Sequence, residues 1–96
     1  MNGLEPTAIV LPPSLDLLGA EPLCRQLRTK VLSGEAVIVD GGQVERIATA
    51  CVQVLVAAAK SAQSRSLSFR LLTPSTALTG ALSDLGLADE LNGQDS

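Results

Sequence analysis

The side chains best suited to chemistry lie in one stretch, between Asp40 and Gln53. Asp40 is a carboxylate at the end of the apolar run 36–39, and Thr49 is a hydroxyl directly ahead of an apolar segment that begins at Ala50. We expect Thr49 to open a helix, where its hydroxyl can accept a hydrogen bond from a free backbone N–H group. A helix N-terminus also attracts anions through its dipole and its free N–H groups, so a phosphate would be well placed there. Thr49 is therefore expected mainly as a helix cap, and it is also a candidate phosphorylation site.

The other polar residues of this stretch have structural as well as functional interpretations. Asp40 is favoured as a buried or capping carboxylate, with partner contact as the alternative. Glu45 and Arg46 lie on the joining loop, either as a solvated ion pair of little energetic value or as recognition residues. Gln53 is polar within an apolar helix, so its amide must face solvent or find a buried partner. The predicted partner-binding set is Asp40, Glu45, Arg46, Thr49, Ala50, Val52 and Gln53.

The composition excludes several kinds of site. The chain has no histidine, tryptophan or tyrosine and a single phenylalanine, Phe69. It therefore has no Ser-His-Asp triad, no histidine metal ligand and no aromatic platform for single-stranded nucleic acid. Lys and Arg total 7 and the net charge is −3, which disfavours binding to a phosphate backbone. With no Gly-rich phosphate loop and no nucleophile beside a base, we predict no enzyme activity, metal, cofactor or nucleic-acid partner.

The cysteines and the chain termini indicate the compartment. Cys24 and Cys51 fit no metal or redox spacing, and both fall on apolar-patterned helical segments, which predicts buried thiols in a reducing cytosol. A lowered thiol pKa is the alternative for Cys51, because it lies in the first turn of its helix. The N-terminal residues do not resemble a signal peptide, and no apolar run approaches the length of a membrane span. We therefore expect a cytoplasmic protein without membrane insertion.

Three apolar runs alternate with three helical patterns along the 96 residues. We expect strands at 7–11, 36–40 and 67–72, and helices at 19–32, at 50–62 and from the residue after the break at Thr73-Pro74-Ser75 to about Leu85. Parallel strands joined by right-handed crossovers place their helices on the same face of a sheet. The predicted fold is α/β, with a small, mostly parallel sheet of three to four strands and about three helices mainly on one face. We expect one domain, with an ordered core over about residues 7–91 and a short polar C-terminal tail.

Helical spacing identifies the side chains that should form the core. Asp16 should cap or turn into the first helix, and Gly34 and Gly86 should end the first and third helices. The strand at 67–72 alternates between apolar and polar residues, which predicts one covered and one wet face. The inward positions are Ala20, Leu23, Leu27 and Val31 in the first helix, Val52, Leu55, Val56 and Ala59 in the second, and Leu78, Leu82 and Leu85 in the third.

The stretch around Asp40 resembles the core motif of STAS domains, the sulfate-transporter and anti-sigma-antagonist family. That motif is an apolar strand, Asp, a short loop, the tetrad Asp-Ser-Ser-Gly or Asp-Thr-Ala-Gly, and an apolar helix. Here the strand and Asp40 match, and Val44 and Ile47 occupy apolar loop positions. The tetrad is Ala-Thr-Ala-Cys at 48–51, so the phosphorylatable serine of the family corresponds to Ala50 and only Thr49 keeps a hydroxyl.

The resemblance extends over roughly residues 7–91. The segment Leu15-Asp16-Leu17 with Ala20 is similar to the family's entry to its first helix, and Pro74-Ser75, Leu82 and Gly86-Leu87 are similar to its ending. Two family features are expected to be absent: the N-terminal antiparallel strand and a final strand. In STAS domains the edge beside the second helix is the surface that a partner kinase reads, which implies the same role for the helix at 50–62.

A narrower resemblance is to the small STAS proteins encoded in bacterial chemotaxis operons. It rests on Pro13-Ser14-Leu15-Asp16-Leu17, Pro22-Leu23, Val44-Glu45-Arg46 and Cys51-Val52-Gln53-Val54-Leu55 with Ala57-Ala58. It implies a signalling accessory protein that binds a chemotaxis histidine kinase or its response regulator.

Two other STAS roles stay open. The small STAS subunit of an ABC-type lipid transporter, which binds the ATPase, also carries Thr-Ala in the tetrad, as Thr49-Ala50 does here. An anti-anti-sigma factor, which binds an anti-sigma-type kinase, is less favoured because Ala50 replaces the serine. Unpaired sheet edges would allow a weak homodimer as well as a monomer. The identity of the partner and the modification of Thr49 are not determined by the sequence.

Overall fold

The computed structural model describes residues 8–87. The expected strand start at Thr7, the packing of Leu91, the C-terminal tail and any strand ahead of Thr7 lie outside the described residues. Within them the chain order is β1 (Ile9–Val10), β2 (Ser14–Leu15), the 3₁₀ turn η1 (Leu17–Gly19), α1 (Ala20–Leu32), β3 (Val37–Asp40), β4 (Arg46–Ile47), α2 (Thr49–Ser64), β5 (Phe69–Leu72) and α3 (Thr76–Asp84).

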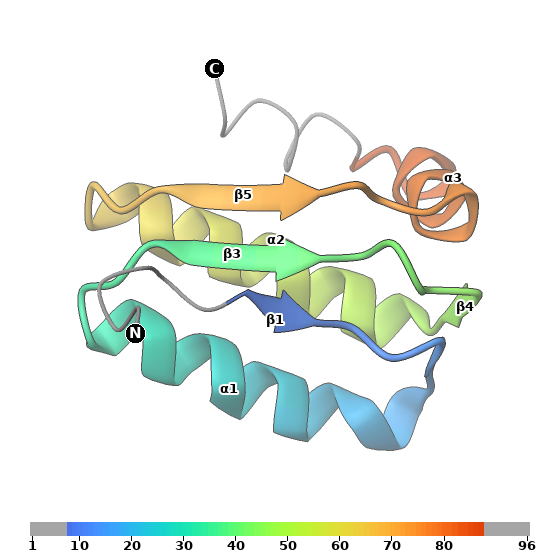
Figure 1. Ribbon diagram of the computed structural model, residues 1–96, viewed down its shortest axis with the longest axis horizontal. Coiled ribbons are helices and arrows are strands. Elements are labelled where there is room, and N and C mark those ends of the chain that lie inside the picture. Colours follow the sequence, from blue (N-terminus) through green and yellow to red (C-terminus); the bar gives the residue numbers. More distant parts are fainter. Residues whose placement is uncertain (1–7, 88–96) are drawn as a thin grey trace, which may run out of the picture.

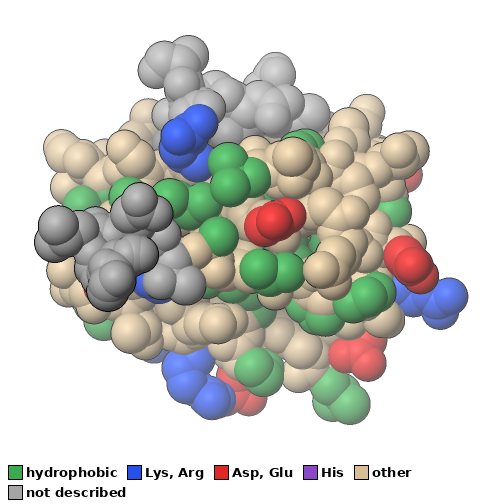
Figure 2. Space-filling model, viewed as in Figure 1, with side chains coloured by type: hydrophobic (Ala, Val, Ile, Leu, Met, Phe, Trp, Pro, Cys, Tyr) green, Lys and Arg blue, Asp and Glu red, His purple; other side chains and the backbone are tan. Residues whose placement is uncertain are grey.

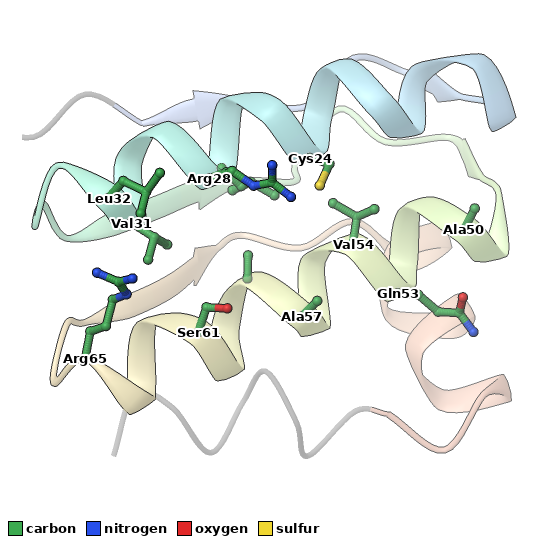
Figure 3. Close-up of a pocket in the computed structure, with 12 residues that line it drawn as sticks. Cys24, Arg28, Val31, Leu32, Ala50, Gln53, Val54, Ala57, Ser61 and Arg65 are labelled. Carbon is green, nitrogen blue, oxygen red and sulfur yellow. The ribbon is translucent and has the colours of Figure 1, made fainter.

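The main sheet has three parallel strands in the order β1-β3-β5. Ile9 pairs with Val39, and Val39 pairs with Leu71 on its other side. The helices α1 and α2 lie on the same face of this sheet, and α3 lies beyond the carboxyl end of β5 (Figures 1 and 3). The predicted fold class is therefore confirmed, as right-handed crossovers between sequential strands require.

One face of the sheet is buried beneath the helices and the other is open. Val37, Val39 and Phe69 are at most 1% exposed, whereas Val10 is 54% exposed and Arg70 is also exposed. The predicted alternation of the third strand is confirmed by Phe69 and Arg70. Figure 2 shows the open face, where apolar side chains gather around an acidic one.

The core is aliphatic because the chain has one aromatic residue to bury. Phe69 is that residue, and it packs among leucine, valine and alanine side chains. The stripe of α1 is confirmed at Leu23, Leu27 and Val31. The predicted face of α2 is confirmed too. Its buried residues are Cys51, Val52, Leu55, Val56, Ala58, Ala59 and Ala62. The small residues among them, the cysteine and the alanines, let the helix approach its neighbours closely.

Helix ends follow the expected glycines, with one error at α3. Gly34 and Gly86 have φ values of 76° and 71°, which suits a residue without a Cβ atom. The prediction that Leu85 points inward is wrong, because α3 ends at Asp84 and Leu85 is 41% exposed. Leu87 packs against the core instead, and its N–H donates to the carbonyl of Leu82 at 2.7 Å.

A second, two-stranded sheet was not expected from the sequence. β2 pairs in parallel with β4, and the carbonyl of Pro13 accepts from the N–H groups of Glu45 at 2.7 Å and Arg46 at 3.1 Å. Proline lacks the N–H donor of a sheet ladder but keeps its acceptor, so Pro13 ends β1 and still binds this loop. The segment ahead of α2 is consequently tied to the segment ahead of α1.

Gly41 is placed where a side chain would collide with the core. A Cβ atom there would lie 2.5 Å from Cδ2 of Leu78, which is fully buried and has little room to move. We predict that Gly41→Ala lowers the free energy of unfolding by about 1–3 kcal/mol in urea titrations. Gly80→Ala is the matched control: nothing lies within 4 Å of that position in α3, and it should gain about 0.5–1 kcal/mol. Equal effects at the two glycines would contradict the close packing of Gly41.

Candidate functional site

The first turn of α2 is held against the segment that leads into α1. The N–H of Ala48 donates to the carbonyl of Leu15 at 2.8 Å, and Sγ of Cys51 donates to the carbonyl of Asp16 at 3.3 Å. Both segments lie at the carboxyl end of the strands, near β4 (Figure 1). These bonds fix the exposed side chains at the start of α2 relative to those of the segment that leads into α1.

Thr49 is not the cap of α2. The N-cap is Ala48, whose backbone is extended (φ −74°, ψ 149°) and whose side chain makes no capping hydrogen bond. Thr49 is the first helical residue and its side chain is exposed. The predicted cap is therefore wrong by one position, because the bond from Ala48 to Leu15 keeps Ala48 outside the helix. Within residues 8–87, the N–H groups of Thr49 and Ala50 have no acceptor.

Asp40 is used to hold two loops together. Its Oδ1 accepts from the N–H of Gly42 at 2.9 Å and from Oγ1 of Thr73 at 3.3 Å. The carboxylate is half-buried and joins the loop after β3 to the loop after β5. This is the structural use that we favoured for Asp40. No hydrogen bond links it to Thr49 within the described part of the chain.

The remaining predicted residues divide by exposure. Glu45, Arg46 and Gln53 are exposed, and no ion pair joins Glu45 to Arg46 among residues 8–87. Ala50 is half-buried. Val52 is 0% exposed and belongs to the core, so its assignment as a partner contact is wrong. Helical spacing explains the error: Val52 shares the inward face with Leu55, and Gln53 faces outward.

Two exposed leucines beside the start of α2 are absent from the predicted partner-binding set. Leu17 is 69% exposed and Leu18 is 85% exposed, in the η1 turn that packs against the start of α2. The spacing of apolar residues gives no signal for them, because both leucines precede α1. We call Leu17, Leu18, Thr49, Ala50 and Gln53 the α2 surface.

Cys51 is a buried thiol, as predicted, whereas Cys24 is only half-buried. Burial raises the pKa of the Cys51 thiol, and the nearby Asp16 carboxylate raises it further. The alternative of a lowered pKa is therefore wrong, because desolvation outweighs the helix dipole at this position. Cys51 is not poised as a nucleophile.

The comparisons with known proteins place the chain in a family. A family model described as "Mlab, STAS domain" matches residues 3–92, nearly the whole chain. The chain belongs to the STAS domain family. No curated protein matches the chain. STAS domains are generally non-catalytic regulatory modules that interact with protein partners, and this STAS domain is of the anti-sigma-factor-antagonist type.

No helix in residues 8–87 is long and apolar enough to span a membrane. No group of three or more histidine, cysteine or acidic side chains in this range is placed to hold a metal ion.

The missing cap of α2 gives a stability test. We predict that Ala48→Ser raises the free energy of unfolding by about 0.5–2 kcal/mol, because its hydroxyl can accept from a free N–H of the first turn. Thr49→Ala should change that free energy by less than about 0.5 kcal/mol, as an exposed helical residue without a capping role would. Chemical denaturation measures both, and a larger loss in Thr49→Ala than gain in Ala48→Ser would restore Thr49 as the cap.

Cys51 gives a pH dependence. Its pKa in the folded protein lies above the ordinary 9.0, so the folded state keeps the thiol proton more firmly than the unfolded state does. This stabilisation is complete below about pH 9 and is lost as the pH rises through the folded pKa. We predict that, above about pH 9, the free energy of unfolding falls more steeply in the wild type than in Cys51→Ala. Cys24→Ala retains Cys51 and should keep the steeper fall.

Proposed function

We propose that this STAS domain binds a chemotaxis histidine kinase or its response regulator through the α2 surface. The observation that carries the proposal is the pair of exposed leucines, Leu17 and Leu18, beside the exposed side chains of Thr49 and Gln53. Single exposed leucines are common on proteins, whereas adjacent apolar side chains rimmed by polar ones are typical of docking surfaces. The segment Cys51-Val52-Gln53-Val54-Leu55, which resembles the chemotaxis STAS proteins, forms the start of α2 and supports this choice of partner.

Binding rather than catalysis is the expected action of this surface. The leucines would be buried in the partner as apolar anchors, and Gln53 would supply hydrogen bonds at the rim. The position of the family's phosphorylatable serine holds Ala50, so a switch at that position is not available. A phosphate on Thr49 would bring roughly 1.5–2 negative charges beside the leucines, and we infer that it would weaken partner binding.

A second candidate partner is the ATPase of an ABC-type lipid transporter. The Thr49-Ala50 pair favours it, since the STAS subunits of those transporters carry the same pair in the tetrad. An anti-sigma-type kinase is the third candidate, disfavoured by Ala50. In each case we propose that the chain acts as one domain in the cytoplasm, as a monomer or weak homodimer, with β1 and β5 as the edge strands.

The test is an affinity pulldown from the native cytosol, with partners identified by mass spectrometry. Leu18→Asp should reduce recovery of the kinase or regulator at least tenfold, because a charge would replace an apolar anchor. Leu32→Asp is the matched control: Leu32 is 62% exposed at the other end of α1, so the same substitution there should leave recovery unchanged. Circular dichroism establishes that both variants fold.

Three results would change the proposal. Recovery of an ABC ATPase in place of the signalling proteins would make the transporter role the function. Equal losses in Leu18→Asp and Leu32→Asp would remove the α2 surface as the docking site. Recovery of the kinase by Leu18→Asp at the wild-type level would have the same meaning.

A further inference from the structure

A groove runs between α1 and α2, the two helices that cover one face of the sheet. It has a volume of about 480 Å³, within the range of about 300–1,000 Å³ that is usual for small-molecule sites. Its floor includes the buried Leu27 and Val31, and its α2 wall includes Val54, Ala57 and Ala58. Figure 3 shows Val31 on α1 and Val54 and Ala57 on α2. The alanines keep the groove open, because a larger residue at 57 would fill it.

The only charged side chains that line the groove in the described structure are Arg28 and Arg65. Figure 3 shows the Arg28 guanidinium alongside α1, close to Cys24, and the Arg65 guanidinium extending from the end of α2 toward Val31 and Leu32. Neither has an ion-pair or hydrogen-bond partner for its guanidinium among residues 8–87. Arg25, one turn from Arg28 on the same helix, is paired with Glu21 at 3.2 Å and does not line the groove. In a chain of net charge −3, this groove is therefore locally positive.

An apolar channel with two free guanidinium groups and no acid in its lining is complementary to an anion with an apolar tail. Guanidinium groups bind carboxylate and phosphate oxygens through paired hydrogen bonds. A thin alkyl chain suits this groove better than a protein helix does. Helix docking requires several large apolar side chains within reach, and most of the large apolar lining is buried at the floor, with Leu32 alone among the leucines exposed at the rim.

We propose that the α1–α2 groove is a binding site for a single-chain amphiphile with an anionic head group. Arg28 and Arg65 supply the positive charge that attracts the head group, and the alkyl chain lies along Val54 and Ala57. The site does not depend on the identity of the protein partner. It meets the α2 surface at Ala50 and Gln53, which line its far end.

Calorimetric titration of the full chain with dodecanoate and with dodecyl phosphate, below their micelle concentrations, tests the proposal. Dodecyltrimethylammonium, which has the same chain and a cationic head group, is the negative probe. We expect saturable binding of one or both anions and none of the cation. Carboxylate and phosphate are separate arms, so their relative affinities identify which head group the arginines prefer.

Four variants test the assignment of residues. Arg28→Ala and Arg65→Ala should each weaken binding at least tenfold, the usual effect of losing a charge-assisted hydrogen bond. Arg25→Ala removes the same charge from the same helix outside the groove and should change the affinity less than twofold. Ala57→Leu should abolish binding by filling the groove. Positions 28, 57 and 65 are exposed, so these substitutions are compatible with folding.

The cysteines provide an internal reporter of where the ligand binds. Cys24 lines the groove and is half-buried, whereas Cys51 is buried in the core. Saturating dodecanoate should slow alkylation of Cys24 and leave the alkylation of Cys51 unchanged.

Equal binding of cationic and anionic probes, or anion binding unaffected by Arg28→Ala and Ala57→Leu, would overturn the proposal. So would the absence of saturable binding, including the case in which light scattering shows that a second copy of the chain occupies the groove.

Discussion

The position of α2 depends on hydrogen bonds between two short segments that are far apart in the sequence. Carbonyl groups of Pro13, Leu15 and Asp16 accept from Glu45, Arg46, Ala48 and Cys51. These bonds fix where α2 begins, and the rest of the helix then packs on the sheet by apolar contact. Because the donors and acceptors are mostly backbone groups, this arrangement tolerates variation of the side chains around it. The side chains of the tetrad can therefore differ from the family pattern while the fold is kept.

The helices pack closely because α2 presents small residues to its neighbours. Ala58, Ala59 and Ala62 are at most 9% exposed, and α1 and α2 are in contact. Close helix packing would normally leave no room between the two helices. Here the exposed Ala57 lines the groove that remains between α1 and α2 above the buried core. The same residue type thus produces tight contact on one side of the helix and open space on the other.

Much of the fold could be predicted from the sequence because it rests on periodicity. The three main strands, the three helices and most inward positions follow from the spacing of apolar residues, and Gly34 and Gly86 mark two helix ends. The β2–β4 sheet could not be predicted, since two-residue strands have no pattern and depend on contacts between distant residues, such as Ser14 with Arg46. The site was predicted less well. Thr49 and Gln53 are exposed near the start of α2, but the cap lies at Ala48, Val52 is in the core and Leu17 and Leu18 were missed. Exposure of a leucine depends on tertiary packing, which a local pattern does not contain.

The absence of a capping side chain at Ala48 also has a consequence for motion. The first N–H groups of α2 have no hydrogen-bond acceptor within residues 8–87. The opening of this turn therefore costs less free energy than the opening of turns deeper in the helix. The part of α2 that carries Thr49 and Ala50 is then the part most able to adjust its backbone when another molecule meets it. Recognition at this end would combine the apolar side chains of Leu17 and Leu18 with a helical turn that can adjust its backbone. A protein built in this way can accept partners that differ slightly in shape without rearranging its core.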